Sequence, residues 1–163
     1  SKYAFEQTDV ATIILLTRQA LPVIDRNKYE SENNFTKGAY IISECQSNPE
    51  IVIFATGSEV WVALEAKEML SDYSVRVVNL SCWELFEEQS QSYKDSVLNS
   101  GDALLVSVEA GITDGWQKFT GRYGLNIGID RYGASAPGAH VAEYLELTPK
   151  HVVDKIKSKL LSN

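Results

Sequence analysis

The stretch from residue 51 to residue 69 constrains the fold more than any other part of the sequence. Residues 51–55 are all apolar, a turn with a single glycine follows at 56–58, and apolar side chains then recur with a helical period. A short apolar run, a turn and an amphipathic helix are typical of a βα unit in a parallel sheet. Further apolar runs at 75–80 and 103–108 extend the pattern along the chain.

The order of these runs predicts an α/β fold with three layers, α/β/α, around a five-stranded, mostly parallel sheet. Too few residues separate a strand at 38–43 from the run at 51–55 for a helical crossover, so this strand should pair antiparallel at a sheet edge. Right-handed crossovers place helices on both faces. A last strand is expected at 126–130, and helices are expected at 58–72, 83–86, 91–98, 115–119 with Asp114 as N-cap, 139–146, and 149–161 with Thr148 as N-cap.

The first 37 residues do not fit this repeating pattern. Residues 10–17 resemble a strand buried on both faces, but no helix pattern precedes them to cover it. Residues 25–37 are polar and rich in charge, as in a linker. We therefore expect a domain boundary within 25–37. We also expect residues 10–17 to be exposed, disordered or paired with another chain as an added strand.

Charge, hydropathy and cysteine content exclude several classes of function. The chain has 163 residues and a net charge of -7, so it lacks the basic surface that nucleic-acid binding requires. No apolar run approaches the roughly 18 residues of a membrane span, and no signal peptide is evident. Cys45 and Cys82 have no metal-ligand spacing and are expected to be reduced. These features predict a cytoplasmic protein with no membrane or nucleic-acid partner.

Candidate chemical groups follow the predicted strands, because ligands of open α/β sheets bind beyond the carboxyl ends of the strands. Ser58 and Glu59 follow the first parallel strand, and Glu109 follows the run at 103–108. The single glycine and the carboxylate of Glu59 make a phosphate site at that turn improbable. For Glu109, an acid in a crevice and a carboxylate capping a helix have the same sequence pattern, so both interpretations stay open.

Arg18, Trp83 and Phe86 are candidates of a different kind. Arg18 directly follows residues 10–17, where a guanidinium at a strand end could hold a phosphate or carboxylate through paired hydrogen bonds. The alternative from the residues alone is a solvated arginine in a salt bridge. Trp83 and Phe86 come just after a strand end and beside acidic residues, and they form the preferred interface candidate. Core packing is the alternative for both.

A series of short motifs resembles the C-terminal part of transketolase. In chain order they are TRQALP at 17–22, KGAY at 37–40, ATGSEV at 55–60, WELF at 83–86, YKDSVL at 93–98, VEAG at 108–111 and YGASAP at 132–137. Each motif alone is weak evidence. Their order and spacing agree with that family along nearly the whole chain, and together they are specific.

The resemblance implies a division of the chain and a role for one candidate residue. Residues 1–24 would be a remnant of the pyrimidine-binding domain that includes its last strand, residues 25–37 a linker, and residues 38–163 the C-terminal α/β domain. Arg18 would match the arginine that grips the phosphate of sugar-phosphate substrates. The residues for thiamine diphosphate, for its divalent cation (Mg²⁺ or Ca²⁺) and for catalysis would lie in the missing domains, so this chain is expected to bind no cofactor.

The resemblance also implies an activity for the whole enzyme. Transketolase is a homodimeric transferase of the pentose phosphate pathway that moves a two-carbon ketol unit from a ketose phosphate to an aldose phosphate. This chain would be a severed C-terminal piece that supports the structure and the dimer and is inactive without the N-terminal domains. The alternative is a freestanding subunit or regulatory binding module of a split thiamine-dependent enzyme. A start in the middle of a domain favours the first.

Overall fold

A five-stranded sheet organises the computed structural model, which describes residues 4, 6, 8–9, 11–17, 19–25, 27–29, 32–98 and 101–162. The strands run in the order β1-β3-β2-β4-β5, with β1 antiparallel to β3 and the other pairs parallel. Their bounds are Ala39–Ser43 for β1, Ile51–Ala55 for β2, Val75–Leu80 for β3, Leu104–Val108 for β4 and Leu125–Ile127 for β5. The predicted fold class, with its antiparallel edge strand, is confirmed.

Strand β2 forms the middle of the sheet because it has no polar side chain to direct toward water. All five of its residues are 0% exposed, and it is hydrogen-bonded to β3 on one side and to β4 on the other. Side chains alternate between the two faces of a strand. Ile51 and Ile53 therefore enter one core, while Val52 and Phe54 enter the other.

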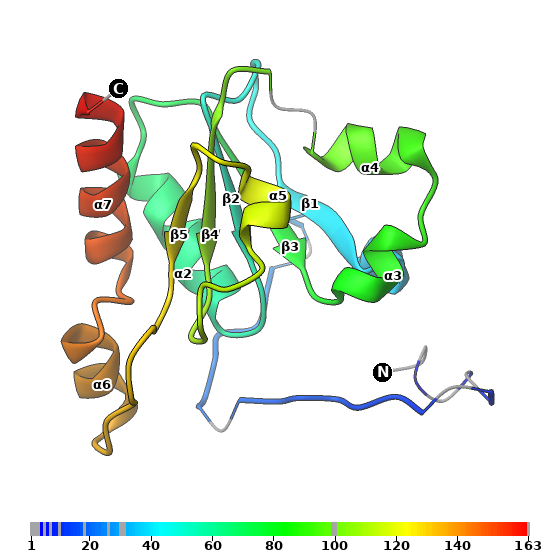
Figure 1. Cartoon of the computed structure of the whole chain (residues 1–163), viewed down its shortest axis with the longest axis horizontal. Helices are drawn as coiled ribbons and strands as arrows, with labels where there is room; N and C mark the ends of the chain where they lie inside the picture. Colours follow the sequence, from blue (N-terminus) through cyan, green and yellow to red (C-terminus); the bar gives the residue numbers. More distant parts are fainter. Residues whose placement is uncertain are drawn as a thin grey trace.

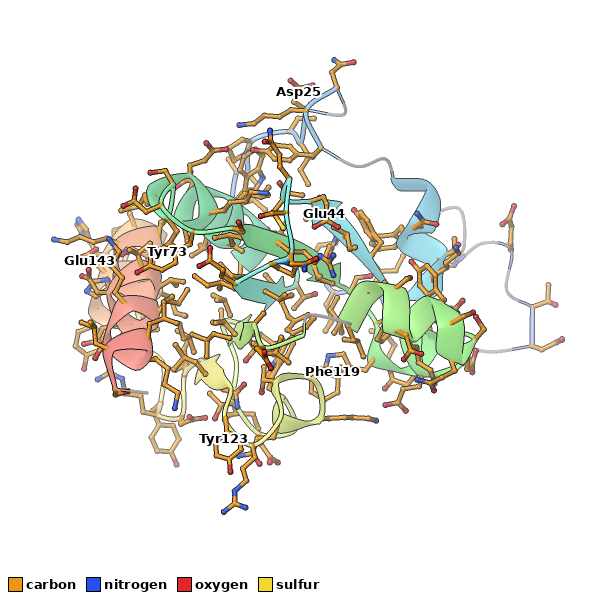
Figure 2. All side chains as sticks on the ribbon, turned by 90° about the horizontal axis from the view of Figure 1, so that it is seen from above. Asp25, Glu44, Tyr73, Phe119, Tyr123 and Glu143 are labelled. Atoms are coloured by element: carbon orange, nitrogen blue, oxygen red, sulfur yellow. The ribbon has the colours of Figure 1, made fainter. Side chains whose placement is uncertain are left out.

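Helices cover both faces of the sheet (Figure 1). One face is covered by α2 (Glu59–Met69) and α7 (Pro149–Leu161), and the other by α3 (Trp83–Glu87), α4 (Gln91–Leu98) and α5 (Gln117–Thr120). Figure 2 shows the two cores from above, with Tyr73 beside α7 on one side and Phe119 on the other. The remaining helices are η1 (Glu32–Lys37), a 3-10 helix before β1, and α6 (Gly138–Tyr144), which precedes α7. None of the helices in the described ranges is long and apolar enough to cross a bilayer.

The structure departs from the sequence prediction mainly between β4 and α6. Helix α5 begins at Gln117 with Trp116 as its N-cap, so the prediction that Asp114 caps this helix is wrong. Gly115, with a φ of 84°, turns the chain before the helix can start. Strand β5 ends at Ile127, earlier than predicted, because the Ile129 N–H leaves the ladder and donates to the Gly111 carbonyl at 2.6 Å. The N-cap of α7 is confirmed, since Thr148 accepts from the His151 N–H.

The first part of the chain lies outside the sheet. Residues 11–17 form neither helix nor strand, and their large side chains face solvent, with Ile13, Leu15 and Leu16 at 85%, 89% and 83% exposure. Of the outcomes expected for this segment, exposure is the one observed. The boundaries predicted at residues 24, 25 and 37 stay predictions, although the predicted linker ends in η1.

Gly38 and Gly57 form a matched pair of variants that tests how closely the chain before β1 approaches the backbone of α3. Both have a positive φ, 81° and 56°, which strains any larger residue. A Cβ at Gly38 would also overlap the Cys82 carbonyl oxygen and the Phe86 nitrogen, whereas one at Gly57 meets no atom within 4 Å. We expect Gly38→Ala to lower the free energy of unfolding by about 3 kcal/mol and Gly57→Ala by about 1 kcal/mol. Urea denaturation measures both values, and equal losses would contradict the close approach at Gly38.

Candidate functional site

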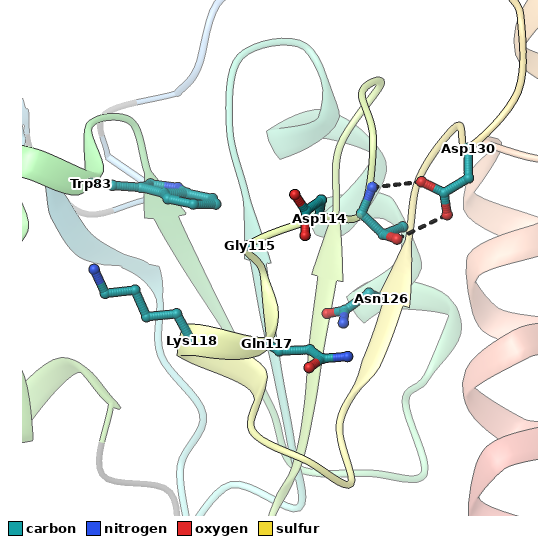
Figure 3. Close-up of a pocket in the computed structure, with 8 residues that line it drawn as sticks. Trp83, Asp114, Gly115, Gln117, Lys118, Asn126 and Asp130 are labelled. Atoms are coloured by element: carbon teal, nitrogen blue, oxygen red, sulfur yellow. Dashed lines mark hydrogen bonds between the residues drawn. The ribbon is translucent and has the colours of Figure 1, made fainter.

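The loops after β4 and β5 enclose a hollow at the carboxyl ends of the parallel strands (Figure 3). Ligands of open α/β sheets bind at this end, so it is the first place to look for chemistry. The hollow has a volume of about 600 Å³ and is lined by Trp83, Thr113, Asp114, Gly115, Gln117, Lys118, Asn126 and Asp130. We call it the carboxyl-end hollow.

Asp130 joins the two loops on one side of the carboxyl-end hollow. Its carboxylate accepts hydrogen bonds from the backbone N–H and the hydroxyl of Thr113, both at 2.8 Å and both drawn in Figure 3. These bonds, that of the backbone N–H first, lower the pKa of Asp130 from its ordinary value because they favour the charged form. Asp130 is therefore an ionised acceptor that holds a loop, and a weak base.

Two other polar side chains of the hollow, those of Asn126 and Lys118, also have partners within the domain. The Asn126 side-chain oxygen accepts from the hydroxyls of Ser107 and Thr120, each at 2.8 Å. The Lys118 ammonium pairs with the carboxylate of Glu87. Through these contacts, Asn126 and Lys118 help to hold the loops on the sheet.

Glu109 holds a buried tryptophan. Its Oε2 accepts a hydrogen bond of 2.6 Å from the indole N–H of Trp116, whose ring is 1% exposed and leads into α5. A buried N–H without an acceptor is costly, so this carboxylate stabilises the loop after β4. This contact is not the helix cap considered from the sequence, and the alternative of an acid in a crevice stays a prediction.

Ser58 and Glu59 lie beyond the end of β2 and do not line the carboxyl-end hollow. Ser58 is the N-cap of α2, but its hydroxyl donates to the Glu59 carboxylate at 2.8 Å and makes no side-chain bond to the helix backbone. Glu59 stands in the first turn, where a negative charge complements the helix dipole. Because Ala55 at the end of β2 pairs with Val108 at the end of β4, Ser58, Glu59 and Glu109 follow neighbouring strand ends, and none of the three lines the hollow.

Trp83 and Phe86 have different environments. Trp83 lines the carboxyl-end hollow and packs edge-on against Trp116 and Phe119, with ring centroids 5.2 and 5.1 Å apart. Phe86 is 1% exposed and lies in the core beneath α3, 6.3 Å from Phe119. Within this chain, Phe86 has no surface to offer a partner, and the interface prediction rests on Trp83.

Arg18 lies outside the residues that the structure describes. Sequence reasoning did not select Asn126 or Asp130 as site residues. The rule that selected Glu109, a polar residue at a strand end, also applies to Asp130 at the end of the predicted strand 126–130. Within the described ranges, no three His, Cys, Asp or Glu side chains come together in a group that could hold a metal ion.

Comparison with known families and sequences identifies relatives over almost the entire chain. Residues 38–148 match the family described as the transketolase-like TK C-terminal domain. The transketolase of Aquifex aeolicus is 46% identical over 99% of this chain and 24% of its own length. The chloroplastic transketolase of Solanum tuberosum is 42% identical over 96% of this chain and 21% of its own length. The chain thus spans less than a quarter of these relatives.

Solved structures with a similar fold are also transketolases. Transketolase of Pichia stipitis in complex with sedoheptulose-7-phosphate superposes with a TM-score of 0.79 at 33% identity, covering 88% of this chain and 20% of that one. Transketolase from Leishmania mexicana has a TM-score of 0.70 at 36% identity, covering 77% and 18%. A split gene transketolase, described as an inactive β4 tetramer, shares the fold with a TM-score of 0.61 at 18% identity, covering 77% and 43%.

The bond between Glu109 and Trp116 predicts a loss of stability when the carboxylate is removed. Glu109→Ala leaves the buried indole N–H without an acceptor and should lower the free energy of unfolding by about 2 kcal/mol. Glu109→Gln keeps a carbonyl acceptor at the same place and should cost about half as much. Urea denaturation of both variants provides the measurement. Unchanged stability in both would mean that the carboxylate does not hold Trp116.

Proposed function

This chain belongs to the transketolase family, and from that premise we propose that it is the C-terminal α/β domain of a thiamine diphosphate-dependent transketolase. The observation that carries the proposal is the match of residues 38–148 to the family of this domain. The enzyme would move a two-carbon ketol unit from a ketose phosphate to an aldose phosphate. Sedoheptulose-7-phosphate, which is bound in the Pichia stipitis structure, is a ketose phosphate.

The cofactor and its divalent cation belong, in this proposal, to the part of the enzyme outside this chain. When bound, thiamine diphosphate supplies an electron sink for the carbanion that two-carbon transfer requires. The described residues do not fit that group. Their acids and histidines form no metal-binding cluster, and Asp130, Asn126 and Glu109 already accept hydrogen bonds within the domain.

In this proposal the chain supports the structure of the enzyme and helps to orient the substrate. We assign Arg18 the role of gripping the substrate phosphate, because a guanidinium forms two parallel hydrogen bonds with phosphate oxygens. Binding energy from this non-reacting phosphate can be used to orient the reacting carbon. The free thiols of Cys45 and Cys82 suit a reducing compartment such as the cytoplasm.

Residues 11–17 are the proposed link to the rest of the enzyme. They are apolar, rich in β-branched side chains and exposed in this chain, so they can gain stability by entering a sheet in the pyrimidine-binding domain. Residues 1–24 would then belong to that domain, residues 25–37 would link it to residues 38–163, and the assembled enzyme would be a homodimer. Trp83, with its ring at the rim of the carboxyl-end hollow, is the candidate contact for the dimer.

The alternative is a freestanding subunit of a split enzyme. It is favoured by one observation: a split gene transketolase contains a domain of this fold. The two forms differ in the size of the native polypeptide. An antibody raised against this chain should detect a band several times larger than 18.1 kDa in a lysate of the source cells if the domain belongs to a whole transketolase, and a band near that size if it is a subunit.

Removing the Arg18 guanidinium should selectively weaken the binding of phosphorylated substrates. In the full-length enzyme, Arg18→Ala should raise KM for a ketose phosphate by about 10- to 100-fold, the range expected for losing charged hydrogen bonds. KM for an unphosphorylated ketose should stay the same. Steady-state kinetics with both donors measures this, and Arg122→Ala, which removes an exposed arginine elsewhere, is the control. An equal rise in KM for both ketoses would mean that Arg18 does not contact the phosphate.

The chain alone should not bind thiamine diphosphate. Isothermal calorimetry of the chain with thiamine diphosphate and Mg²⁺ should give no heat of binding, because the proposed binding cleft lies in the other domains. The full-length enzyme under the same conditions is the positive control. A stoichiometric, metal-dependent affinity in the micromolar range for the chain alone would refute this assignment.

A further inference from the structure

Helix α6 and the loop before it form an exposed surface beyond strand β5. We call this surface the shelf and define it as residues 131–144, which end with α6. Residues 131–140 are all exposed, and α6 has no buried residue. Helices α2 to α5 and α7 each bury at least one side chain in a core. The domain's own packing therefore leaves α6 uncovered.

The shelf has the composition of a surface that another protein surface covers. Residues 132–142 contain no Asp, Glu, Lys or Arg, although 23% of the chain is charged. The ring of Tyr132 is fully exposed. Ile112, on the neighbouring loop after β4, is also exposed. A lack of charge together with exposed aromatic and apolar side chains is typical of the central part of a protein interface.

Contacts at both ends of α6 give the shelf a defined shape. The Arg131 guanidinium donates a hydrogen bond of 2.8 Å to the Tyr144 carbonyl and lies over the Tyr144 ring, 4.6 Å from its centroid. This contact joins the first residue of the shelf to the last. Leu147, which is buried in the core, donates its backbone N–H to the Ala142 carbonyl at 2.9 Å. A surface that is already ordered loses little conformational entropy when a partner covers it.

The chain that precedes the sheet is held at the same end of the domain as the shelf. The indole N–H of Trp61, in the first turn of α2, donates a hydrogen bond of 2.9 Å to the Pro22 carbonyl. Since α2 directly follows β2, Pro22 lies at the carboxyl end of the sheet, where the loop from β5 to α6 also begins. Figure 1 shows α6 and the blue segment with residues 11–17 at the same, lower end of the molecule.

The length of the chain limits how far the preceding domain can lie from this end. An extended chain spans at most about 3.5 Å per residue, so the Cα atoms of residues 17 and 22 are no more than about 18 Å apart. Under the proposed function, residues 1–24 belong to the pyrimidine-binding domain. That domain must then adjoin the carboxyl end of the sheet, where the shelf offers it an uncharged surface.

We propose that the shelf is the docking surface for the pyrimidine-binding domain of the same polypeptide. This inference rests on the function proposed above, which places residues 1–24 in that domain. The surface that meets the shelf is itself uncharged, because a charge enclosed against residues 132–142 would have no ionic partner there. The C-terminal domain is thus bound to its neighbour at two places, through the chain that contacts Trp61 and through the shelf.

Hydrogen exchange followed by mass spectrometry tests whether the shelf is covered. Peptides from residues 131–144 should exchange about tenfold more slowly in the full-length enzyme than in this chain alone, because a covering domain protects their amides. Residues 121–124, in the turn at the opposite end of β5, are the control and should exchange equally in both proteins. Equal exchange of residues 131–144 in both proteins would overturn the proposal.

Photo-cross-linking identifies the occupant of the shelf. In the full-length enzyme, p-benzoylphenylalanine in place of Tyr132 should form a link to the pyrimidine-binding domain within one polypeptide. The linked protein should keep the mass of one subunit on a denaturing gel, and mass spectrometry should find the linked peptide in that domain. The same amino acid in place of Tyr123, an exposed tyrosine before β5, should form no such link. A band of twice the mass, a link to another domain or no link from position 132 would each overturn the proposal.

Two alanine variants separate docking from folding. Tyr132→Ala and Tyr123→Ala each remove an exposed ring and should leave the thermal unfolding of this chain unchanged. In the full-length enzyme, Tyr132→Ala should speed exchange over residues 131–144 about fivefold, and Tyr123→Ala should not. Equal exchange in the two variants would contradict the docking role of the shelf.

Activity measured on the same full-length samples distinguishes the two levels of the proposal. An enzyme that transfers the two-carbon unit from a ketose phosphate, but whose shelf exchanges as fast as in this chain, would contradict the docking and leave the proposed function intact. A full-length protein without this transfer activity would contradict the proposed function, and the docking inference would fail with it.

Discussion

The complete burial of β2 is the constraint on which the rest of this structure depends. A strand with apolar side chains on both faces can fold only if helices cover both, and α2 with α7 on one side and α3 to α5 on the other provide this. Because β2 lies between β3 and β4, the chain must cross the sheet after β3. The connection from β3 to β4 passes over β2, and β4 then lies beside β5 in the same direction, so the loops that follow β4 and β5 meet at one end of the sheet. The carboxyl-end hollow is a product of that topology.

Several polar groups at this end of the sheet bond to each other. Glu109 holds the Trp116 indole, Asp130 holds Thr113, and Asn126 accepts from two hydroxyls. In a low-dielectric environment a polar group that lacks a partner is costly, so these bonds stabilise the loops. The hollow thus lies where ligands of α/β sheets bind, and the Glu109, Asp130 and Asn126 side chains hold the loops around it in place.

The pattern of apolar and capping residues predicted those parts of the fold that depend on residues close together in the sequence. The strands β2 and β3, the helix at Gln91–Leu98 and the cap of α7 by Thr148 follow from periodicity and from residues within one turn. The start of α5 could not be predicted in the same way, because it depends on the positive φ of Gly115. The role of Glu109 depends on a tryptophan brought back by that turn, and the bond from Trp61 to Pro22 spans 39 residues. Contacts of this kind exist only once the tertiary structure has formed.

The exposed residues 11–17 also affect how such a chain behaves in a cell. A stretch of this length that is rich in β-branched residues, contains no proline and bears no charge has the composition of segments that stack into cross-β fibrils. Pairing with a sheet would protect these residues from aggregation. While they are exposed, residues 11–17 are therefore a site at which copies of the chain can associate and at which proteases can cut.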